Sequence, residues 1–530
     1  MRTAPAMRTN NLTAVRCMND GRLATNSLNV SKNAHLHVDM SICPRRHPGH
    51  GPRLAKNCRH EDMSQNAPLS VPYLAMLNTE TPKVSLVTML EATSEDVVGD
   101  FVSALLAPKG WEVDGIRKRA SRLEPPDRYW AMFEIQARES QPKIDARARS
   151  LRLVARGAFG ADAWEDLHAR LERHTGRPAD PIDGLGYPMI LAEKQVAFWF
   201  YPFDPSMPGL PAAADPDTMT RVLLGHDDPP VPLPDGVPNL SVERVRYLPE
   251  VGAILRYHFE TSAGPLSIYG KVQPGDRGLR TQKIVEGLWN SKVPNADGLL
   301  NLPRPLGFID RYGLLLEQAI PGAPVQGNRR SNEFQNAALA AAEAVAVVHE
   351  SGVETDIEIW LDAELERLDR VAEQFAYVNP QGHFLLSDLI VHLRNRARVA
   401  FAEEWRPTHG DLKYDQFVHH NGRYTLLDFD YYGHAETSYD LGKFCAYLVP
   451  SNPMGWEDTV AAEAARLSFL RRYLELRPHA TVNRFPIYEA LQLALRAMSF
   501  MWAQQHGWER IAETFLVMAH ERLYSRFPEV

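Results

Sequence analysis

Apolar and polar residues in the first part of the chain fall into two blocks whose predicted elements follow a similar order. In the first block, helical spacing over SEDVVGDFVSALLA precedes strand-like runs over RYWAMFEIQA and RSLRLVARGAF, a helix over ADAWEDLHARLERH and two apolar runs. In the second, strands are predicted over VERVRYL, AILRYHFET and LSIYGKVQP, then a helix over RTQKIVEGLWNS and a strand over YGLLLEQAIPG. SLRLVARGAF stands where LSIYGKVQP stands, with Arg156 opposite Lys271. This order fits a duplicated β-rich unit or, as the alternative, two unrelated α+β segments.

Helical spacing dominates the rest of the chain. Helices are predicted over 333–350, 357–376, 384–404, 456–475 and 487–526. The predicted fold class is α+β. We expect a leader over 1–70, an N-terminal α+β domain over 90–225, a Pro/Asp-rich linker over 226–238, a second β-rich unit over 239–322 and a helical part over 323–530.

The first seventy residues are basic and lack apolar periodicity, which predicts disorder. They contain no apolar signal segment. A transit-like leader and a mis-annotated start, with Met63 or Met76 as the true first residue, both fit this pattern. Cys17, Cys43 and Cys58 lie here among several histidines, so a zinc site is an alternative interpretation, although no C-x-x-C pair is present.

Composition indicates the class of protein, its partners and its location. The chain of 530 residues has 44% hydrophobic and 23% charged residues, as soluble globular proteins do. No segment has the ~20 apolar residues of a membrane helix, so no membrane partner is expected. A net charge of −8 argues against a nucleic-acid partner. Four cysteines make no disulfide framework, which favours a reducing, cytoplasmic location.

The segment HGDLKYDQFVHHNGRYTLLDFD, from His409 to Asp430, carries the candidate chemistry. Phosphoryl transfer needs a group that accepts or orients a proton, and oxygen ligands for Mg²⁺. Asp411 can be the base, and Gln416 and Asp428 can offer an amide oxygen and a carboxylate. A tight turn at Asn421-Gly422 would form a short hairpin that returns Asp428 to the side of Asp411.

HGDLKYDQF, LLDFD and SYDLGKF, in this order, resemble the signature of the aminoglycoside phosphotransferase and choline kinase family, whose fold is protein-kinase-like. The family pattern is H-G-D-x(4)-N, then an apolar run with I-D-[WF]-[ED], then D-L-[AG]. The resemblance covers residues 240–526 and implies a two-lobed protein-kinase-like fold, with an N-lobe over 239–322, a C-lobe over 323–530 and an additional N-terminal α+β domain.

The resemblance implies roles for residues of the C-lobe. It places Asp411 as the catalytic base and Asp428 as the main Mg²⁺ ligand, with Asp430 assisting. Gln416 stands where the family has a metal-binding Asn, and its side chain is one methylene longer. His409 and Asp440 are implied to hold the catalytic loop by hydrogen bonds.

The resemblance also extends to the N-lobe. Lys271 resembles the lysine that grips the nucleotide phosphates, and Glu286 in the next helix is expected to pair with its ammonium group. The run from Leu314 to Gly322, with Glu317 and Ala319, resembles the hinge whose backbone binds adenine. RYLPEVGAILRY stands at the nucleotide-covering loop and contains one glycine, Gly252, in place of a glycine-rich sequence.

These features lead to two hypotheses. In the first, the chain is a small-molecule kinase, an ATP- and Mg²⁺-dependent phosphotransferase acting on a hydroxyl of an aminoglycoside-, choline- or sugar-like substrate. The acidic residues that could attract a cationic substrate are Glu403, Glu404, Glu436 and Asp415. In the second, it is a nucleotide-binding pseudokinase or a non-catalytic binding protein. Taken singly, a lysine in a strand and an Asp-x-Asp turn have ordinary structural explanations. Sequence does not fix the oligomeric state.

Overall fold

The computed structural model describes residues 91–125, 128–140, 148–158, 160–172, 188–224, 240–261, 264–291, 299–451 and 456–525. The predicted leader over 1–70 and linker over 226–238 lie outside the described residues, and so do Cys17, Cys43 and Cys58. The remaining cysteine, Cys445, is buried and reduced.

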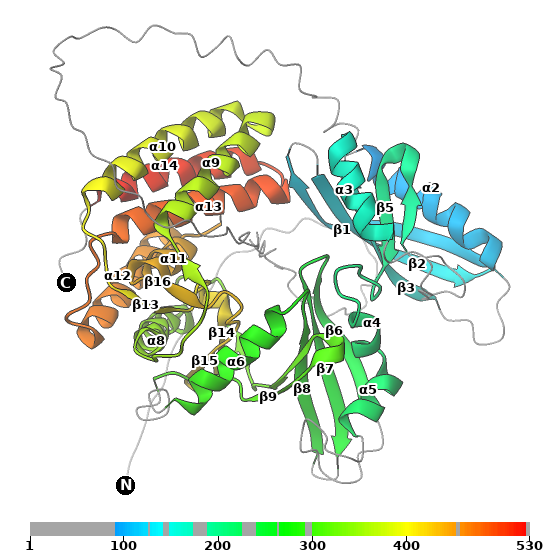
Figure 1. The fold of residues 1–530 in the computed structure, drawn as a ribbon, viewed down its shortest axis with the longest axis horizontal. Coiled ribbons are helices and arrows are strands. Elements are labelled where there is room, and N and C mark those ends of the chain that lie inside the picture. The colour runs from blue at the N-terminus through cyan, green and yellow to red at the C-terminus, as the bar shows by residue number, and fades with distance from the viewer. Residues whose placement is uncertain are drawn as a thin grey trace, which may run out of the picture. The chain divides into compact units, whose positions relative to one another are not determined.

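Five antiparallel strands form the first sheet, in the order β1-β2-β3-β5-β4 (Figure 1). They are β1 (Trp111–Glu124), β2 (Arg128–Glu139), β3 (Arg149–Ala158), β4 (Met189–Leu191) and β5 (Val196–Phe200). Helix α2 (Glu95–Leu106) precedes the sheet, and α3 (Ala161–Glu172) connects β3 to β4. Strand β1 was not predicted, because WEVDGIRKRASRLE is largely charged and lies at an exposed edge of the sheet.

The second sheet repeats this order as β6-β7-β8-β10-β9, again fully antiparallel. Its strands are β6 (Leu240–Leu248), β7 (Gly252–Thr261), β8 (Gly264–Val272), β9 (Pro305–Ile309) and β10 (Leu314–Gln318). Helix α6 (Arg277–Asn290) connects β8 to β9, as α3 connects β3 to β4. A short 3₁₀ turn joins the last two strands of each sheet, at Ala192–Lys194 and at Asp310–Tyr312.

Strand register aligns the two sheets residue by residue. Arg156 of β3 faces Trp130 on β2 and Ala197 on β5. Lys271 of β8 faces Ile254 on β7 and Leu315 on β10. Since Ala197 and Leu315 are each the second residue of the equivalent strand, Arg156 and Lys271 hold the same place in their sheets. This is the correspondence that the sequence indicated.

Apolar side chains bury the first sheet from both sides, which explains the nearly continuous apolar runs of β2 and β5. Phe133 and Phe198 pack with the buried face of α2. Trp130 and Trp199 share a core with the second sheet, which contributes Leu255 among others. Two short helices of the connecting segment, α4 (Leu210–Ala213) and α5 (Pro216–Leu223), add their apolar residues to the same core.

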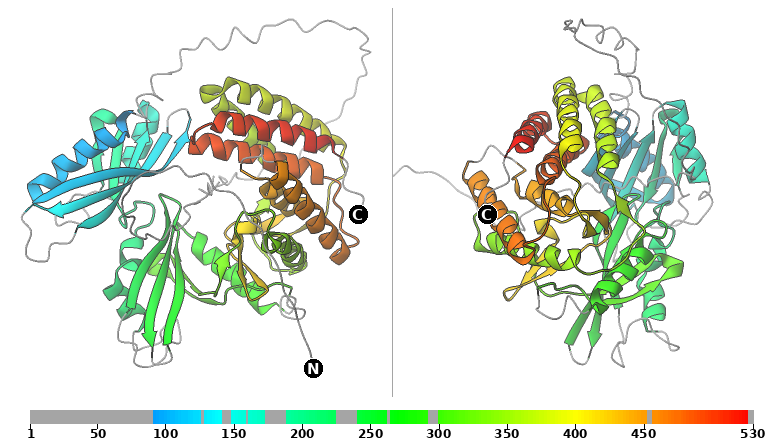
Figure 2. Two further views of the ribbon diagram at one scale, coloured as in Figure 1. Left: turned by 180° about the vertical axis from the view of Figure 1, so that it is seen from behind. Right: turned by 60° about the vertical axis from the view of Figure 1, so that its left-hand side comes forward.

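The helical part begins after β11 (Ala323–Pro324) with α8 (Asn332–His349), β12 (Glu358–Ile359), α9 (Leu361–Val378) and α10 (Pro380–Val399). It continues with β13 (Trp405–Thr408), β14 (Phe417–His420), β15 (Arg423–Leu426), β16 (Gly433–Glu436) and α11 (Ser438–Leu448). The last helices are α12 (Trp456–Leu476), α13 (Phe485–Ala503) and α14 (Trp508–Tyr524). Helix α14 lies between α10 and α13 (Figures 1 and 2).

Two features of the helical part differ from the sequence prediction. The single helix expected over 487–526 is two helices, because the chain turns at Gln504 and Gly507, which both have positive φ angles of 48° and 74°. Helix α11 was not predicted. Its residues SYDLGKFCAYL are buried almost throughout, so they show no polar face.

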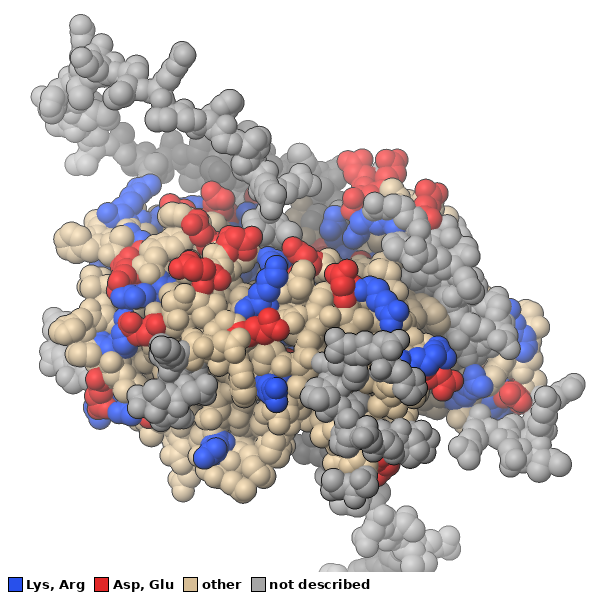
Figure 3. Space-filling view, turned by 60° about the horizontal axis from the view of Figure 1, so that its bottom comes forward, with Lys and Arg blue, Asp and Glu red and all other residues tan. Residues whose placement is uncertain are grey.

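The surface carries charges of both signs. On the face shown in Figure 3, Lys and Arg side chains lie among Asp and Glu side chains, with uncharged areas between them. Of the helices in the described ranges, none combines the length and the apolar character needed to cross a membrane. The fold is α+β, as predicted.

Candidate active site

The hairpin predicted from the Asn-Gly pair is present and brings the candidate metal ligands together. Strands β14 and β15 are joined by Asn421 and Gly422, whose φ angles are 47° and 79°. Gly and Asn enter this left-handed region at the lowest cost, which fixes the two-residue loop. At the other end of the hairpin, the Leu427 N–H donates to the Gln416 carbonyl over 3.0 Å. Gln416 therefore lies across the hairpin from the residue that precedes Asp428.

Asp440, in the first turn of α11, holds the loop that carries Asp411. Its carboxylate accepts hydrogen bonds from the backbone N–H groups of His409 (2.7 Å) and Gly410 (2.9 Å). Burial alone would raise the pKa of Asp440, but the hydrogen bond and charge of His349 outweigh it, so the pKa is lowered. These contacts are the ones that the family resemblance implied for His409 and Asp440.

Gly410 permits the close turn of this loop. Its φ is +80°, and a Cβ atom there would lie 1.9 Å from the carbonyl oxygen of Tyr431. No side chain fits at this distance. His409 closes the other side, because its Nε2 lies 3.0 Å from the Leu427 carbonyl oxygen. The loop and the hairpin are thus fixed against each other.

Asp411 lies between two buried lysines. Its carboxylate oxygens are 2.6 Å from Lys413 Nζ and 3.0 Å from Lys443 Nζ, and Gln416 Nε2 donates to Oδ2 over 3.0 Å. Burial alone would raise the pKa of Asp411, but the two ammonium groups outweigh it and hold the pKa at about 2. The carboxylate is therefore charged at neutral pH and is a weak proton acceptor.

Neither lysine was predicted from the sequence to belong to the site. Lys413 had a visible signal, because it stands two residues after the aspartate, in HGDLK. Lys443 stands in SYDLGKF on α11, and its approach to Asp411 depends on how that helix packs. No local pattern could have shown that approach.

Lys271 bridges the second and third candidate carboxylates. Its Nζ lies 2.6 Å from Asp428 Oδ1 and 2.5 Å from Asp430 Oδ2. Asp430 also accepts hydrogen bonds from Gln273 Nε2 (2.6 Å) and Thr281 Oγ1 (3.1 Å). The second sheet and α6 are thus connected to the hairpin by one cluster of charged and polar groups.

The two carboxylates differ in protonation behaviour. Burial alone would raise the pKa of Asp428, but Lys271 outweighs it and the pKa lies well below its usual range. Burial raises the pKa of Asp430 to about 6, since Lys271 only partly offsets it and the charge of Asp428 adds to it. The side chain of Asp430 is 5% exposed and that of Asp428 is 31% exposed. Asp428 also has φ +70°, a strained backbone for a residue that is not glycine.

Glu286 does not pair with Lys271, contrary to the sequence prediction. Its Oε1 accepts a hydrogen bond from Gln282 Nε2 (2.7 Å), one turn earlier on α6. The prediction was wrong because the ammonium group of Lys271 is already neutralised by Asp428 and Asp430.

The predicted hinge begins at the end of β10. Glu317 is the fourth residue of that strand, and burial raises its pKa to about 7, against the opposing charge of Lys271. Ala319 follows the strand and is half-buried.

Most of the acidic residues proposed to attract a cationic substrate instead form hydrogen bonds and ion pairs within the helical part. Glu403 accepts hydrogen bonds from the backbone N–H and the hydroxyl of Ser438 (both 2.8 Å). Glu436 pairs with Arg484 Nη1 at 2.7 Å. Both glutamates are buried, and Glu404 pairs with Arg406 on the surface. The structure therefore gives these three a packing or surface role. Asp415 is buried enough that its pKa is raised.

Two buried amide oxygens near the site, Gln416 Oε1 and Gln273 Oε1, have no hydrogen-bond partner in the described part of the chain. Gln416 Oε1 is enclosed and accepts no hydrogen bond within the described part of the chain, while its Nε2 is used by Asp411. An orphaned amide oxygen close to carboxylates fits a hard cation such as Mg²⁺. Gln416, Asp428 and Asp430 stay the predicted ligands of such a cation.

Structure comparison finds similar chains among solved structures of kinases and aminoglycoside phosphotransferases. A choline/ethanolamine kinase family protein from Mesorhizobium loti is similar over 59% of this chain and 95% of its own, at 15% identity and a TM-score of 0.40. The amicoumacin kinase hAmiN in complex with AMP-PNP, Ca²⁺ and Ami is similar over 53% of this chain and 88% of its own, at 14% identity and a TM-score of 0.38. The aminoglycoside phosphotransferase APH(4)-Ia is similar over 54% and 95%, at 13% identity and a TM-score of 0.38. No protein-family model matches the chain, and no curated protein sequence matches it.

Proposed function

We propose that this protein is an ATP- and Mg²⁺-dependent phosphotransferase that acts on a hydroxyl group of a small molecule. The observation that carries the proposal is the grouping of Asp411, Gln416 and Asp428 around one hairpin, with Lys271 across from them and Gln416 Oε1 left without a partner. These are the oxygen ligands, cation and proton acceptor that phosphoryl transfer needs.

Each residue of the candidate active site has a distinct role in this proposal. Lys271 now neutralises Asp428 and Asp430, and would turn to the phosphate oxygens when a cation takes its place between the carboxylates. Gln416, Asp428 and Asp430 would hold Mg²⁺, which when bound screens the negative charge of the phosphates. Asp411 would accept a hydrogen bond from the substrate hydroxyl and orient it. With a pKa of about 2 it positions the hydroxyl more than it removes the proton.

Lys413 and Lys443 extend this assignment. Both ammonium groups contact Asp411, so in this proposal they would lie near the hydroxyl that receives the phosphoryl group. Such cations stabilise negative charge that develops on equatorial oxygens during transfer.

The test is a calorimetric titration of the full chain with a non-hydrolysable ATP analogue, with and without Mg²⁺. We expect Mg²⁺-dependent binding that is lost in Asp428→Ala and kept in Asp310→Ala, a matched change at an exposed aspartate. Binding that is absent, or indifferent to Mg²⁺ and to Asp428→Ala, would reject the proposal. A substrate screen would follow, beginning with choline, simple sugars, hygromycin B and amicoumacin.

The second candidate is a nucleotide-binding pseudokinase or non-catalytic binding protein. The low pKa of Asp411 favours it, since a carboxylate held by two lysines is a weak base. Formation of ADP separates the two. Slow Mg²⁺-dependent ATP hydrolysis that disappears in Asp411→Asn supports the enzyme, and nucleotide binding without ADP formation across the substrate screen supports the pseudokinase.

A further inference from the structure

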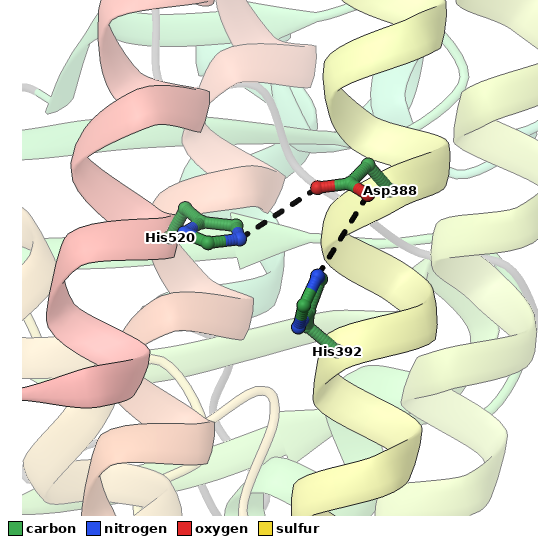
Figure 4. A group of neighbouring side chains, drawn as sticks. All are labelled: Asp388, His392 and His520. Carbon is green, nitrogen blue, oxygen red and sulfur yellow. Dashed lines mark ion pairs between the residues drawn. The ribbon is translucent and has the colours of Figure 1, made fainter.

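Helices α10 and α14 bring two histidines and an aspartate together away from the candidate active site (Figure 4). Asp388 and His392 stand one turn apart on α10, and His520 projects from α14. His392 Nε2 lies 3.7 Å from Asp388 Oδ1, and His520 Nε2 lies 3.6 Å from Asp388 Oδ2. One ligand atom from each residue lies within 4.8 Å of the others, and this is the one such group in the described ranges.

The spacing is close to what a zinc ion needs. Zn²⁺ takes His nitrogen and carboxylate oxygen at about 2.0–2.2 Å, so tetrahedral ligands stand roughly 3.4 Å apart. The two His–Asp separations, which involve different oxygens of the carboxylate, exceed this by a few tenths of an ångström. Because the three ligand atoms lie within 4.8 Å of one another, side-chain rotation has to draw them together around an ion. Two imidazoles favour Zn²⁺ over Mg²⁺, which prefers oxygen ligands.

A second contact prepares His392 as a ligand. Its Nδ1 lies 2.5 Å from the hydroxyl oxygen of Tyr524, the last residue of α14. Occupation of Nδ1 by this hydrogen bond leaves Nε2, the atom that faces Asp388, for a metal. Metal-bound histidines usually have their second nitrogen held in this way. The side chains are 36% to 53% exposed, so an ion and a water ligand can enter.

We propose that Asp388, His392 and His520 form a Zn²⁺ site that ties α14 to α10. Three protein ligands leave a fourth position for water. The site is independent of the proposed phosphotransferase activity. By binding the folded chain and not the unfolded one, the ion stabilises the docking of the last helix.

Zinc stoichiometry measured by chelator competition on the full chain tests this site. His520→Ala and Asp388→Asn are compared with His506→Ala, a matched control at an exposed histidine just before α14. We expect both cluster variants to bind one equivalent less than wild type and than the control. Zinc bound elsewhere in the chain contributes equally to all four proteins and cancels.

Two further readings complete the test. Co²⁺ substituted into wild type should give the visible absorption of a tetrahedral site, and His520→Ala should lose it. Zinc should raise the thermal midpoint of wild type and of His506→Ala more than that of His520→Ala. Equal stoichiometry in wild type and His520→Ala would overturn the site.

An independent observation concerns the turn between β6 and β7, where the resemblance places the nucleotide-covering loop. Glu250 forms this turn with a φ of 61°. Its N–H donates to Asp204 Oδ2 over 2.8 Å, and Arg156 Nε lies 2.9 Å from its Oε2. Tyr247 donates its hydroxyl hydrogen to the same Asp204 oxygen over 2.8 Å. Asp204 and Arg156 both belong to the N-terminal part of the chain and are buried.

We infer that the first sheet positions the nucleotide-covering turn, and that Arg156 and Asp204 are positioning residues for nucleotide binding. This inference rests on the proposed function. The turn lacks a glycine-rich sequence. Its position over the nucleotide is therefore set by these contacts and not by a flexible backbone. Arg156 occupies the place of Lys271 in its own sheet, so an equivalent cation serves the turn in one sheet and the carboxylates in the other.

The test compares Arg156→Met with Arg149→Met, a change on the same strand at an exposed position. Arg156→Met should weaken binding of an ATP analogue by about tenfold or more through misplacement of the turn, and raise KM for ATP more than it lowers kcat. Arg149→Met should change neither.

Amide hydrogen exchange of residues 247–252 can be measured without nucleotide. The exchange rate should be higher in Arg156→Met than in wild type and should be unchanged in Arg149→Met. If exchange is faster in Arg156→Met but the wild-type chain binds no nucleotide, the proposed function is rejected and the positioning contact stands. Unchanged exchange and unchanged affinity would overturn the inference about Arg156.

Discussion

Replacement of Asp411 by Asn measures how much the charge of this carboxylate, which lies between Lys413 and Lys443, contributes to the free energy of unfolding. Asn has the shape of a protonated aspartic acid, so the change removes the negative charge and little else. Both lysines are at most 8% exposed, and Asp411 is 13% exposed, so water does little to weaken the interaction. The cost of the substitution should therefore follow from the pKa of Asp411.

The magnitude comes from the difference between the folded and ordinary pKa values. Asp411 has a pKa of about 2, against an ordinary value of 3.8. Each pKa unit corresponds to roughly 1.4 kcal/mol, so charging Asp411 stabilises the fold by about 2 kcal/mol at pH 7. Because the folded pKa is lowered, this stability is present above pH 4 and is lost as the pH falls through 2. Roughly half of it remains at pH 3.

The assay is urea unfolding of wild type and Asp411→Asn at pH 7 and pH 3. We expect a difference in the free energy of unfolding of about 2 kcal/mol at pH 7 that shrinks by about half at pH 3. Asp415→Asn is the matched control. Burial raises the pKa of Asp415, so the same substitution there should leave stability unchanged or increase it at pH 7.

Two results would refute this reasoning. Equal stability of wild type and Asp411→Asn at pH 7 would mean that burial cancels the attraction of the two lysines. A difference that does not change between pH 7 and pH 3 would mean that it comes from packing and not from charge.

Three further outcomes are expected. Asp440→Asn should lower the free energy of unfolding by about 2 kcal/mol in urea titration, since the amide leaves one buried loop N–H without an acceptor. Gly410→Ala should cost about 3 kcal/mol or more by the same measurement, because the new Cβ collides with the carbonyl oxygen of Tyr431, and no loss would contradict the observed turn. Lys271→Ala should weaken the affinity for an ATP analogue by about tenfold in calorimetry, and an unchanged affinity would remove Lys271 from the site.

The sequence predicted the parts of the site that depend on local chemistry. The Asn-Gly pair requires a two-residue turn, and the turn fixes which residues face each other across the hairpin. The repeated order of strands and helices was also visible, because apolar spacing along each strand is set by the burial of its sheet. Arg156 and Lys271 could be matched for this reason before their register was known.

Tertiary packing decided what the sequence could not show. Lys443 reaches Asp411 from α11, a helix that has no amphipathic pattern because it is buried all round. Glu286 has the expected spacing from Lys271, but two carboxylates from a distant hairpin take its place beside the ammonium group. Strand β1 carries too many charges to look like a strand, since much of its surface faces water.

A chain that contains the same strand order twice can misfold, because strands of one sheet can pair with those of the other. The two sheets differ at equivalent positions in a way that opposes such exchange. Trp130 and Ala197 flank Arg156 in the first sheet, whereas Ile254 and Leu315 flank Lys271 in the second. Exchange of β5 and β10 would put Leu315 beside Arg156 in the first sheet and Ala197 beside Lys271 in the second, so that one position is overfilled and the other contains a void. The difference in side-chain volume at these equivalent positions therefore disfavours exchange of strands between the two sheets.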